Sequence, residues 1–110
     1  WPKGSNTTRK KFPLPENDEG FRIITLGDQI YIQGRGFRGL LFGIGHFLRK
    51  ASYSDVISWE PVNVSTMPDK SIRGHQIGYR NTANSYDAWS VDQYEQYIRD
   101  MIVFGVNSIE

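Results

Sequence analysis

The last third of the chain, from Ile72 to Glu110, has the pattern of a strand, a polar loop, a helix and a second strand. Ser90, followed three residues later by Gln93, forms a capping box at the start of the helix, and Gly105 suits its carboxyl end. Two parallel strands need a crossover connection, which is usually a helix. The pattern therefore predicts a β-α-β unit with two parallel strands.

The first strand of this unit, at 75–79, is expected to be buried, and it leads into a loop rich in ligand-binding side chains. A guanidinium group binds sugar hydroxyls or a carboxylate, carboxylate and amide groups bind sugar hydroxyls, and aromatic rings stack on the apolar face of a sugar. The candidate substrate-binding residues are Arg80, Asn84, Tyr86, Asp87 and Trp89. The alternative is structural, because Arg80 would also pair with Asp87 to shape the loop while the aromatic rings close the rim of a barrel. The residue types leave both interpretations open.

Two short runs earlier in the chain, Phe21–Leu26 and Gln29–Gln33, are rich in β-branched and aromatic residues that alternate between two faces. Between them lies Gly27-Asp28, a two-residue connection with glycine first, which suits a tight type II′ turn. The sequence therefore predicts an antiparallel β-hairpin.

A glycine-rich helix is expected after the hairpin. Its predicted apolar face consists of Phe37, Leu40, Leu41, Ile44, Phe47, Leu48 and Ala51. The glycines within it are Gly36, Gly39, Gly43 and Gly45. Each interior glycine lowers helix stability by about 1 kcal/mol relative to alanine. Close packing of the helix against a sheet or another backbone would offset that loss.

Gly34, Gly36 and Gly39 also match the G-x-G-x-x-G fingerprint of dinucleotide-binding proteins. That fingerprint requires a parallel β-α-β unit, whereas the strand before these glycines is expected to be the second arm of a hairpin. The segment after the helix, 53–59, is only weakly strand-like. Close helix–sheet packing is therefore favoured over nucleotide binding as the role of the glycines.

The two remaining segments have few regular patterns. Residues 1–20 contain three prolines, a basic cluster and then an acidic cluster, which is typical of a linker or an edge segment. In residues 52–71, Pro61 and Pro68 bracket a short extended run. This second segment is expected to be an extended connector between two units.

Composition argues against several classes of function. The chain has 110 residues, no cysteine and a formal charge of +1, so disulfides, thiolate metal sites and a strongly basic nucleic-acid-binding surface are not expected. No apolar run reaches the ~20 residues that a membrane helix needs. A lone histidine is a poor metal site, so His46 and His75 are expected to be structural, with His75 half-buried in its strand. We expect no metal, no cofactor, no nucleic acid and no membrane partner.

The hairpin and the glycine-rich helix precede a connector with Pro68, the Arg73-Gly74 pair and a strand that ends in Arg80. This order resembles family 20 β-N-acetylhexosaminidases and their relatives, including α-glucuronidase-like enzymes. The resemblance implies an α+β accessory domain at 21–70, incomplete at its N-terminus, and the start of a catalytic TIM barrel at 71–110. It also implies that Arg80 is the arginine that binds the sugar.

The same resemblance implies what the segment lacks. The catalytic Asp-Glu pair of the family lies further along the barrel than Glu110, so we expect no catalytic residue in the chain and no hydrolysis by this segment alone. Residues 75–79 lack the aspartate that hexosaminidases usually carry there, so specificity for N-acetylglucosamine is not implied.

We therefore expect a fragment, truncated at both ends, of a bacterial glycosidase that acts on a polysaccharide or oligosaccharide in the periplasm or outside the cell. Self-association through the incomplete barrel would cover its apolar side chains. The alternative is a non-catalytic carbohydrate-binding or structural module.

Overall fold

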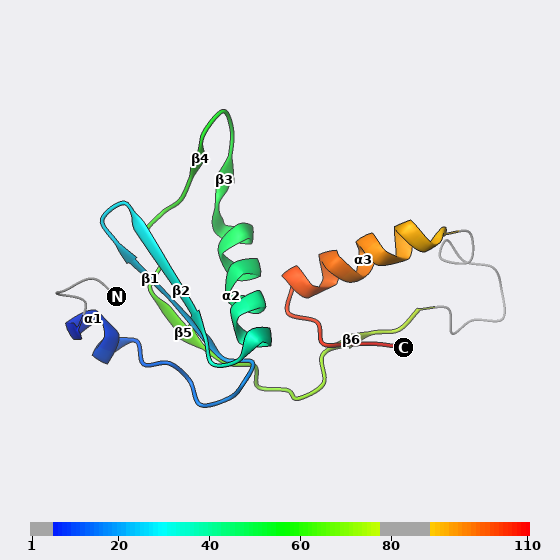
Figure 1. The fold of residues 1–110 in the computed structure, drawn as a ribbon, viewed down its shortest axis with the longest axis horizontal. Coiled ribbons are helices and arrows are strands. Elements are labelled where there is room, and N and C mark those ends of the chain that lie inside the picture. Colours follow the sequence, from blue (N-terminus) through cyan, green and yellow to red (C-terminus); the bar gives the residue numbers. More distant parts are fainter. Residues whose placement is uncertain (1–5, 78–88) are drawn as a thin grey trace.

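A three-stranded antiparallel sheet with one long helix against it forms the first unit of the computed structural model, which describes residues 6–77 and 89–110 (Figure 1). The strands lie in the order β2 (Gln29–Gly34), β1 (Phe21–Leu26) and β5 (Val64–Thr66). With its three helices, the described part of the chain is a small α+β protein, as the sequence predicted.

The predicted hairpin is confirmed, because β1 and β2 pair antiparallel along their whole length. Gly27 has a φ of 60°, which side-chain-bearing residues rarely adopt and which the first position of a type II′ turn requires. Ile23 and Ile24 point to opposite faces of β1, and both are fully buried. This central strand is therefore covered on both faces.

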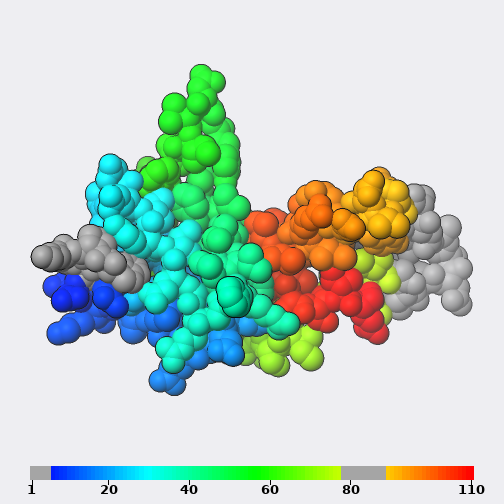
Figure 2. All heavy atoms as spheres, in the orientation of Figure 1, coloured from blue at the N-terminus to red at the C-terminus, as the bar shows by residue number. Residues whose placement is uncertain are grey.

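The segment expected to be an extended connector supplies a third strand and a second hairpin. β5 pairs antiparallel with β1 and forms an edge of the sheet. β3 (Ser52–Tyr53) and β4 (Ile57–Ser58) form a separate two-stranded hairpin that projects beyond the sheet, in green at the top of Figures 1 and 2. The Thr25 hydroxyl anchors the return to β5, since it donates to the carbonyl of Val62 and accepts from its N–H, both at 2.9 Å.

Helix α2 (Phe37–Lys50) packs against the sheet unit through its glycines. A Cβ atom added at Gly39 would lie less than 3.0 Å from the carbonyl oxygen of Gly20. At Gly43 it would lie less than 3.0 Å from the side chain of Ile32 in β2. The close packing predicted for these glycines is therefore confirmed.

The apolar face predicted for α2 is wrong for most of its residues. Phe47 packs against the core, but Phe37 is 89% exposed and Leu41 is 50% exposed. The buried residues of the helix are Gly39, Phe42, Gly43 and Gly45. The core is made of Phe21, Ile23 and Phe42, with Ile30, Ile32, Phe47, Val62, Val64 and Ile102 packed around it. Because glycine lets the helix backbone itself approach the sheet, the small residues face inward and the larger apolar ones remain outside.

The N-terminal segment lies beside the sheet and contains a short helix, α1 (Asn6–Lys11). Arg22, which is buried in β1, donates a hydrogen bond of 3.1 Å to the carbonyl of Phe12. The hydroxyl of Ser65 donates to the carbonyl of Pro13. Two strands of the sheet thus bind backbone carbonyls of the segment that follows α1.

The second unit consists of β6 (Gly74–His75), α3 (Val91–Val103) and β7 (Ser108–Ile109). β6 and β7 pair in parallel, as the β-α-β pattern predicted. The capping box is also confirmed: Ser90 Oγ accepts from the N–H of Gln93 at 3.3 Å, and the Gln93 side chain accepts from the N–H of Ser90 at 2.8 Å.

Backbone geometry defines both the end of α3 and the pairing of β6 with β7. Gly105 has a φ of 85°, as a glycine that ends a helix should. The pairing continues past β6, because the N–H of Ile77 donates to the carbonyl of Glu110 at 2.7 Å. The burial expected for residues 75–79 is wrong at His75 and Gln76, which are exposed, whereas Ile77 is half-buried and residues 78–79 lie outside the described residues. The two short paired strands, β6 and β7, are both exposed. They form a two-stranded sheet within the described residues, too narrow to bury either strand.

The two units meet where α2 and α3 cross (Figure 1). The extents of the molecule are 58 × 37 × 17 Å, and Figure 2 views it along the shortest of these three axes. A Cβ atom at Gly45 would lie less than 3.0 Å from the backbone of Val103, so glycine also sets this contact. Among the described residues, no helix has the length and apolar character needed to cross a membrane.

Replacement of Gly39 by alanine tests the packing of α2. Helix propensity alone predicts that Gly39→Ala stabilises the chain by about 1 kcal/mol. The clash with the Gly20 carbonyl predicts the opposite, a loss of about 1–3 kcal/mol in the free energy of unfolding. Urea unfolding followed by circular dichroism measures the change. A variant as stable as the parent would contradict the close contact between α2 and residue 20.

Candidate functional site

Of the residues proposed to bind substrate, only Trp89 lies within the part of the chain that the structure describes. The others, Arg80, Asn84, Tyr86 and Asp87, lie outside the described residues. Trp89 is half-buried and immediately precedes the capping residue Ser90 of α3. The described part of the candidate site is therefore the carboxyl end of β6 and the start of α3.

Four rings lie together at this place. Trp89 makes edge-to-face contacts with Tyr94 and Tyr97, with ring centroids 5.4 Å and 5.3 Å apart. Tyr97 also contacts His75 of β6, with centroids 5.7 Å apart, and its hydroxyl is hydrogen-bonded to Nδ1 of His75. Aromatic pairs in such geometry each contribute about 0.5–1.5 kcal/mol beyond the area that they bury. The ring group therefore holds the start of α3 against the end of β6.

Local sequence explains how these rings are brought together. The capping box fixes where α3 begins, and Tyr94 and Tyr97 are three residues apart, so they share one face of the helix. Of this group, only Trp89 is among the substrate-binding residues predicted from the sequence. His75, which is expected to be half-buried, is exposed. The helical spacing of two tyrosines just after a tryptophan was the signal that identifies the group.

Apart from the ring group, three polar side chains form a cluster that we call the joint: Glu19, Arg73 and Asn107. The Glu19 carboxylate is 12% exposed and accepts from Arg73 Nη2 at 2.7 Å and from Asn107 Nδ2 at 3.1 and 3.3 Å. Arg38 of α2 adds a longer ion pair at 3.4 Å from a side chain that is largely exposed. One carboxylate thus binds groups from both units of the fold.

Arg73 and Asn107 also fix each other. The N–H of Arg73 donates to Oδ1 of Asn107 at 2.9 Å, and the N–H of Asn107 donates back to the carbonyl of Arg73 at 2.9 Å. The Arg73 guanidinium donates to the carbonyls of Gly105 and Lys70 and lies over the ring of Phe42, 5.3 Å from its centroid. The joint therefore sets the register at which β6 and β7 begin.

The joint determines the charge of Glu19. Burial of the carboxyl group tends to raise the pKa of Glu19, but the hydrogen bonds from Arg73 and Asn107 and the positive charge of Arg73 outweigh it. The net effect is a pKa below the ordinary value of 4.5. Glu19 is thus ionised at neutral pH and serves as an acceptor in the joint.

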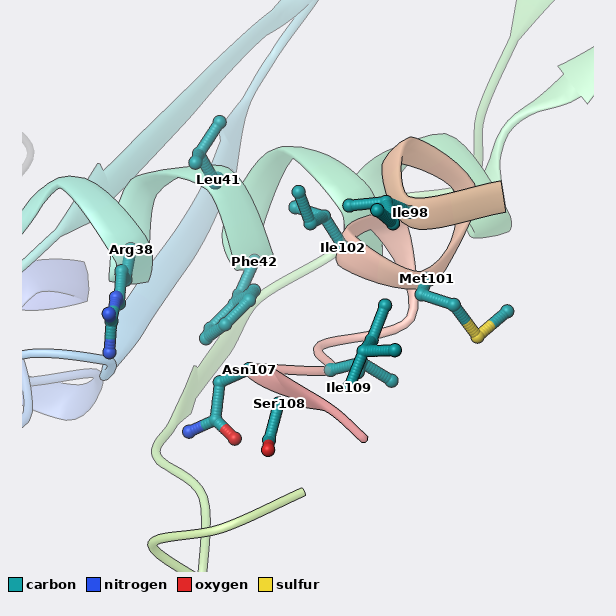
Figure 3. Close-up of a pocket in the computed structure, with 10 residues that line it drawn as sticks. Arg38, Leu41, Phe42, Ile98, Met101, Ile102, Asn107, Ser108 and Ile109 are labelled. Atoms are coloured by element: carbon teal, nitrogen blue, oxygen red, sulfur yellow. The ribbon is translucent and has the colours of Figure 1, made fainter. Parts of the chain in front are cut away.

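An apolar hollow of about 360 Å³ opens beside the joint, between α2, α3 and β7 (Figure 3). It is lined by Arg38, Leu41, Phe42, Ile98, Met101, Ile102, Val106, Asn107, Ser108 and Ile109. Leu41 and Ile98 on its walls are 50% and 42% exposed. Within the described residues, the two units meet here through a surface that they do not fully cover.

Within the described residues, no cluster of metal ligands is found and the glycine fingerprint does not lie in a parallel β-α-β unit. No group of three or more His, Cys, Asp or Glu side chains in 6–77 and 89–110 is placed to hold a metal ion. At the glycine fingerprint, the N–H of Gly36 donates to the carbonyl of Asp18 at 3.0 Å. The strand before it is antiparallel to its neighbour, which is not the arrangement that dinucleotide binding requires.

Comparison of the chain with models of protein families, with curated proteins and with solved structures finds no match.

The joint predicts a specific pH dependence of stability. Glu19→Gln should lower the free energy of unfolding at pH 7 by about 1–3 kcal/mol, because it removes hydrogen bonds to a charged acceptor. The pKa of Glu19 is lowered on folding, so its contribution is complete above the unfolded value near 4.5 and is lost as pH falls through the folded value. Urea unfolding between pH 3 and pH 7 should therefore show the two proteins converge in acid.

Glu95→Gln is the matched control, since Glu95 is largely exposed and pairs with Arg99 one turn along α3 at 2.9 Å. Such an exposed pair contributes only about 0.3–0.5 kcal/mol. An equal loss from the two substitutions, or a loss from Glu19→Gln that does not change with pH, would contradict the role of the joint.

Proposed function

We propose that this chain is the part of a glycoside hydrolase in which a small α+β unit joins the opening β-α-β unit of a (β/α)₈ barrel. The observation that supports the proposal most directly is the parallel pairing of β6 with β7 on either side of α3. A parallel pair with a helix in the connection is the repeating element of such barrels.

The order of residues along the chain supports this proposal. In barrels of this kind, substrates bind on the loops that follow the carboxyl ends of the strands. β6 ends at His75, and Arg80 follows within a few residues along the chain. The ring group of His75, Trp89, Tyr94 and Tyr97 lies at the same end of the strand. In the proposal, Arg80 orients a sugar at the cleavage point, and Asn84, Tyr86, Asp87 and Trp89 contact its hydroxyls and ring faces.

Cleavage of a glycosidic bond usually requires two carboxyl groups, and the proposed loop supplies only one. Glycosidases generally use two carboxyl groups that flank the scissile bond, about 5–10 Å apart depending on the stereochemical outcome. Asp87 is the only acid between Arg80 and Trp89. The proposal therefore gives this segment a substrate-binding role in an enzyme of polysaccharide breakdown and assigns the catalytic acids to later strands of the barrel.

A non-catalytic carbohydrate-binding module is the second candidate. The ring group favours it, because aromatic clusters at a strand end provide apolar surface for a sugar without any catalytic carboxylate. The two candidates predict the same ligands and differ in whether the glycosidic bond is cleaved.

The test is an assay of the protein encoded by the whole reading frame. We expect cleavage of 4-nitrophenyl glycosides. The β-N-acetylglucosaminide and the α-glucuronide are tested first and other sugars after them, because the residues at 75–79 imply no single sugar. Arg80→Ala should lower kcat/KM about 10- to 100-fold, the cost of hydrogen bonds to a charged group. Arg99→Ala is the control, because its partner Glu95 is an exposed neighbour on α3.

Each outcome separates the candidates. Saturable binding of a sugar without cleavage would support the carbohydrate-binding module and contradict the enzyme. Absence of both binding and cleavage, or an Arg80→Ala variant that behaves like the parent, would contradict the proposed site.

Exposed apolar side chains on α2 lead to a prediction about the 110-residue chain itself. Phe37, Leu41, Ile44 and Leu48 form a stripe along α2, and Ile98 of α3 lies beside it at the apolar hollow. Contiguous exposed apolar surface of this kind favours association. Sedimentation velocity should therefore show concentration-dependent self-association, and Leu41→Glu should reduce it. A chain that is monomeric at all concentrations would contradict this prediction.

A further inference from the structure

A second hollow, of about 210 Å³, lies where α2 meets the joint and the end of α3. It is lined by Glu19, Phe21, Phe42, His46, Arg49, Thr66, Met67, Pro68, Arg73, Phe104 and Gly105. Aromatic and other apolar side chains form much of this wall, and four of the lining residues carry titratable or charged groups. Small-molecule sites likewise place a few polar groups on a mainly apolar wall. Because the hollow is smaller than the roughly 300–1,000 Å³ of drug-sized sites, it would suit only a small ligand.

His46 lines this hollow, and its hydrogen-bonding groups are not used within residues 6–77 and 89–110. Its ring is half-buried and tilts against Phe21, with centroids 5.6 Å apart. No hydrogen bond within residues 6–77 and 89–110 involves the His46 side chain. In those residues, every buried side-chain nitrogen or oxygen atom has a hydrogen-bond partner. Because the ring nitrogens of His46 have no such partner there, they are not fully buried. They belong to a residue that lines the hollow.

The charges around His46 are mainly positive. Arg49, one turn along α2, lies over the Phe104 ring at 5.2 Å and donates to the carbonyl of Val103. Arg73 lines the same hollow but is paired with Glu19 in the joint. Burial, and then the charges of Arg49 and Lys50, lower the pKa of His46. A ligand with negative charge would reverse the electrostatic part of that effect.

We propose that this hollow binds a small carboxylate with an apolar body, its carboxylate held by His46 and Arg49 and its body against the Phe42 and Phe104 rings. A guanidinium binds a carboxylate through charge-assisted hydrogen bonds, and an imidazole adds a further donor. The inference is independent of the glycosidase proposal, since none of these residues belongs to the loop after β6.

Two consequences follow from the position of the site. The ligand would contact α2 and the residues that end α3, so binding would stabilise the contact between the two units. A bound carboxylate would also favour the charged form of His46, so its pKa would rise and affinity would increase as pH falls toward that pKa. Arg49, Lys50 and Arg73 oppose protonation of His46, and the ionised Glu19 in the same hollow favours it.

Sodium benzoate is a suitable probe, with benzyl alcohol as an uncharged molecule of the same shape and inorganic phosphate as a second anion. Two-dimensional amide NMR at pH 6.5 should show saturable shifts around His46, Arg49 and Gly105 with benzoate. Binding of benzyl alcohol should be about tenfold weaker or more, the effect of one charge-assisted interaction. Equal affinity for the alcohol, tighter binding of phosphate, or no saturation would overturn the proposal.

Substitutions locate the site. His46→Gln and Arg49→Gln should each weaken benzoate binding by about tenfold. Lys50→Gln is the charge control, because Lys50 does not line the hollow and its charge is one of those that lower the pKa of His46. Its removal should leave benzoate binding as tight as in the parent or tighter, and never weaker. Binding that is unchanged in both His46→Gln and Arg49→Gln would overturn the assignment.

A readout in the unmodified chain covers the case in which a variant does not fold. The ring proton resonances of His46 report its pKa directly, with and without saturating benzoate. A rise in that pKa on binding supports contact between the carboxylate and the ring, and an unchanged pKa overturns it.

Discussion

The ion pair between Glu19 and Arg73 connects the two halves of this fold. Glu19 lies just before the central strand of the sheet, and Arg73 lies just before β6. Asn107 completes the joint, since it binds the same carboxylate and the backbone of Arg73. The apolar core lies mostly within the first unit, so the start of the parallel pair is positioned by polar contacts. The position at which β6 begins therefore depends on a carboxylate more than fifty residues earlier in the sequence.

The second constraint is the size of the residues on one side of α2. Gly39 and Gly43 let the helix approach the sheet unit, and Gly45 lets α3 cross close behind it. Larger residues at these positions would separate the layers and open the contacts of Phe42 with the core and with Arg73. This use of glycine leaves the leucines of α2 outside, which explains why so small a chain has an exposed apolar stripe.

Local patterns predicted those parts of the fold that depend on neighbours in the sequence. The Gly27 turn, the capping box of Ser90 and Gln93 and the glycine end of α3 need only a few adjacent residues, and all are as expected. The buried side of α2 was misjudged because periodicity counts apolar residues, whereas the packing depends on where the backbone comes close. β5 was not recognised as a strand because three residues between prolines carry little signal, and its pairing with β1 comes from tertiary contacts.

The candidate site, too, was predictable only where it depends on neighbouring residues in the sequence. Trp89 is predictable as an aromatic residue in the polar loop that follows a strand, but its contact with Tyr97, and that of Tyr97 with His75, require β6 and α3 to be packed together. The joint and the hollow at His46 combine residues from distant segments, so no spacing in the sequence indicates them. The roles of Arg80, Asn84, Tyr86 and Asp87 stay predictions.

The parallel pairing of β6 and β7 is the claim on which the account most depends, and nuclear Overhauser effects between backbone protons of the two strands measure it directly. Parallel pairing predicts cross-strand contacts between Gly74 and Ser108 and between His75 and Ile109, together with slow amide exchange at Glu110. Antiparallel contacts, or no contact between the two segments in a folded chain, would contradict the β-α-β unit and remove the main support for a barrel-type carbohydrate site.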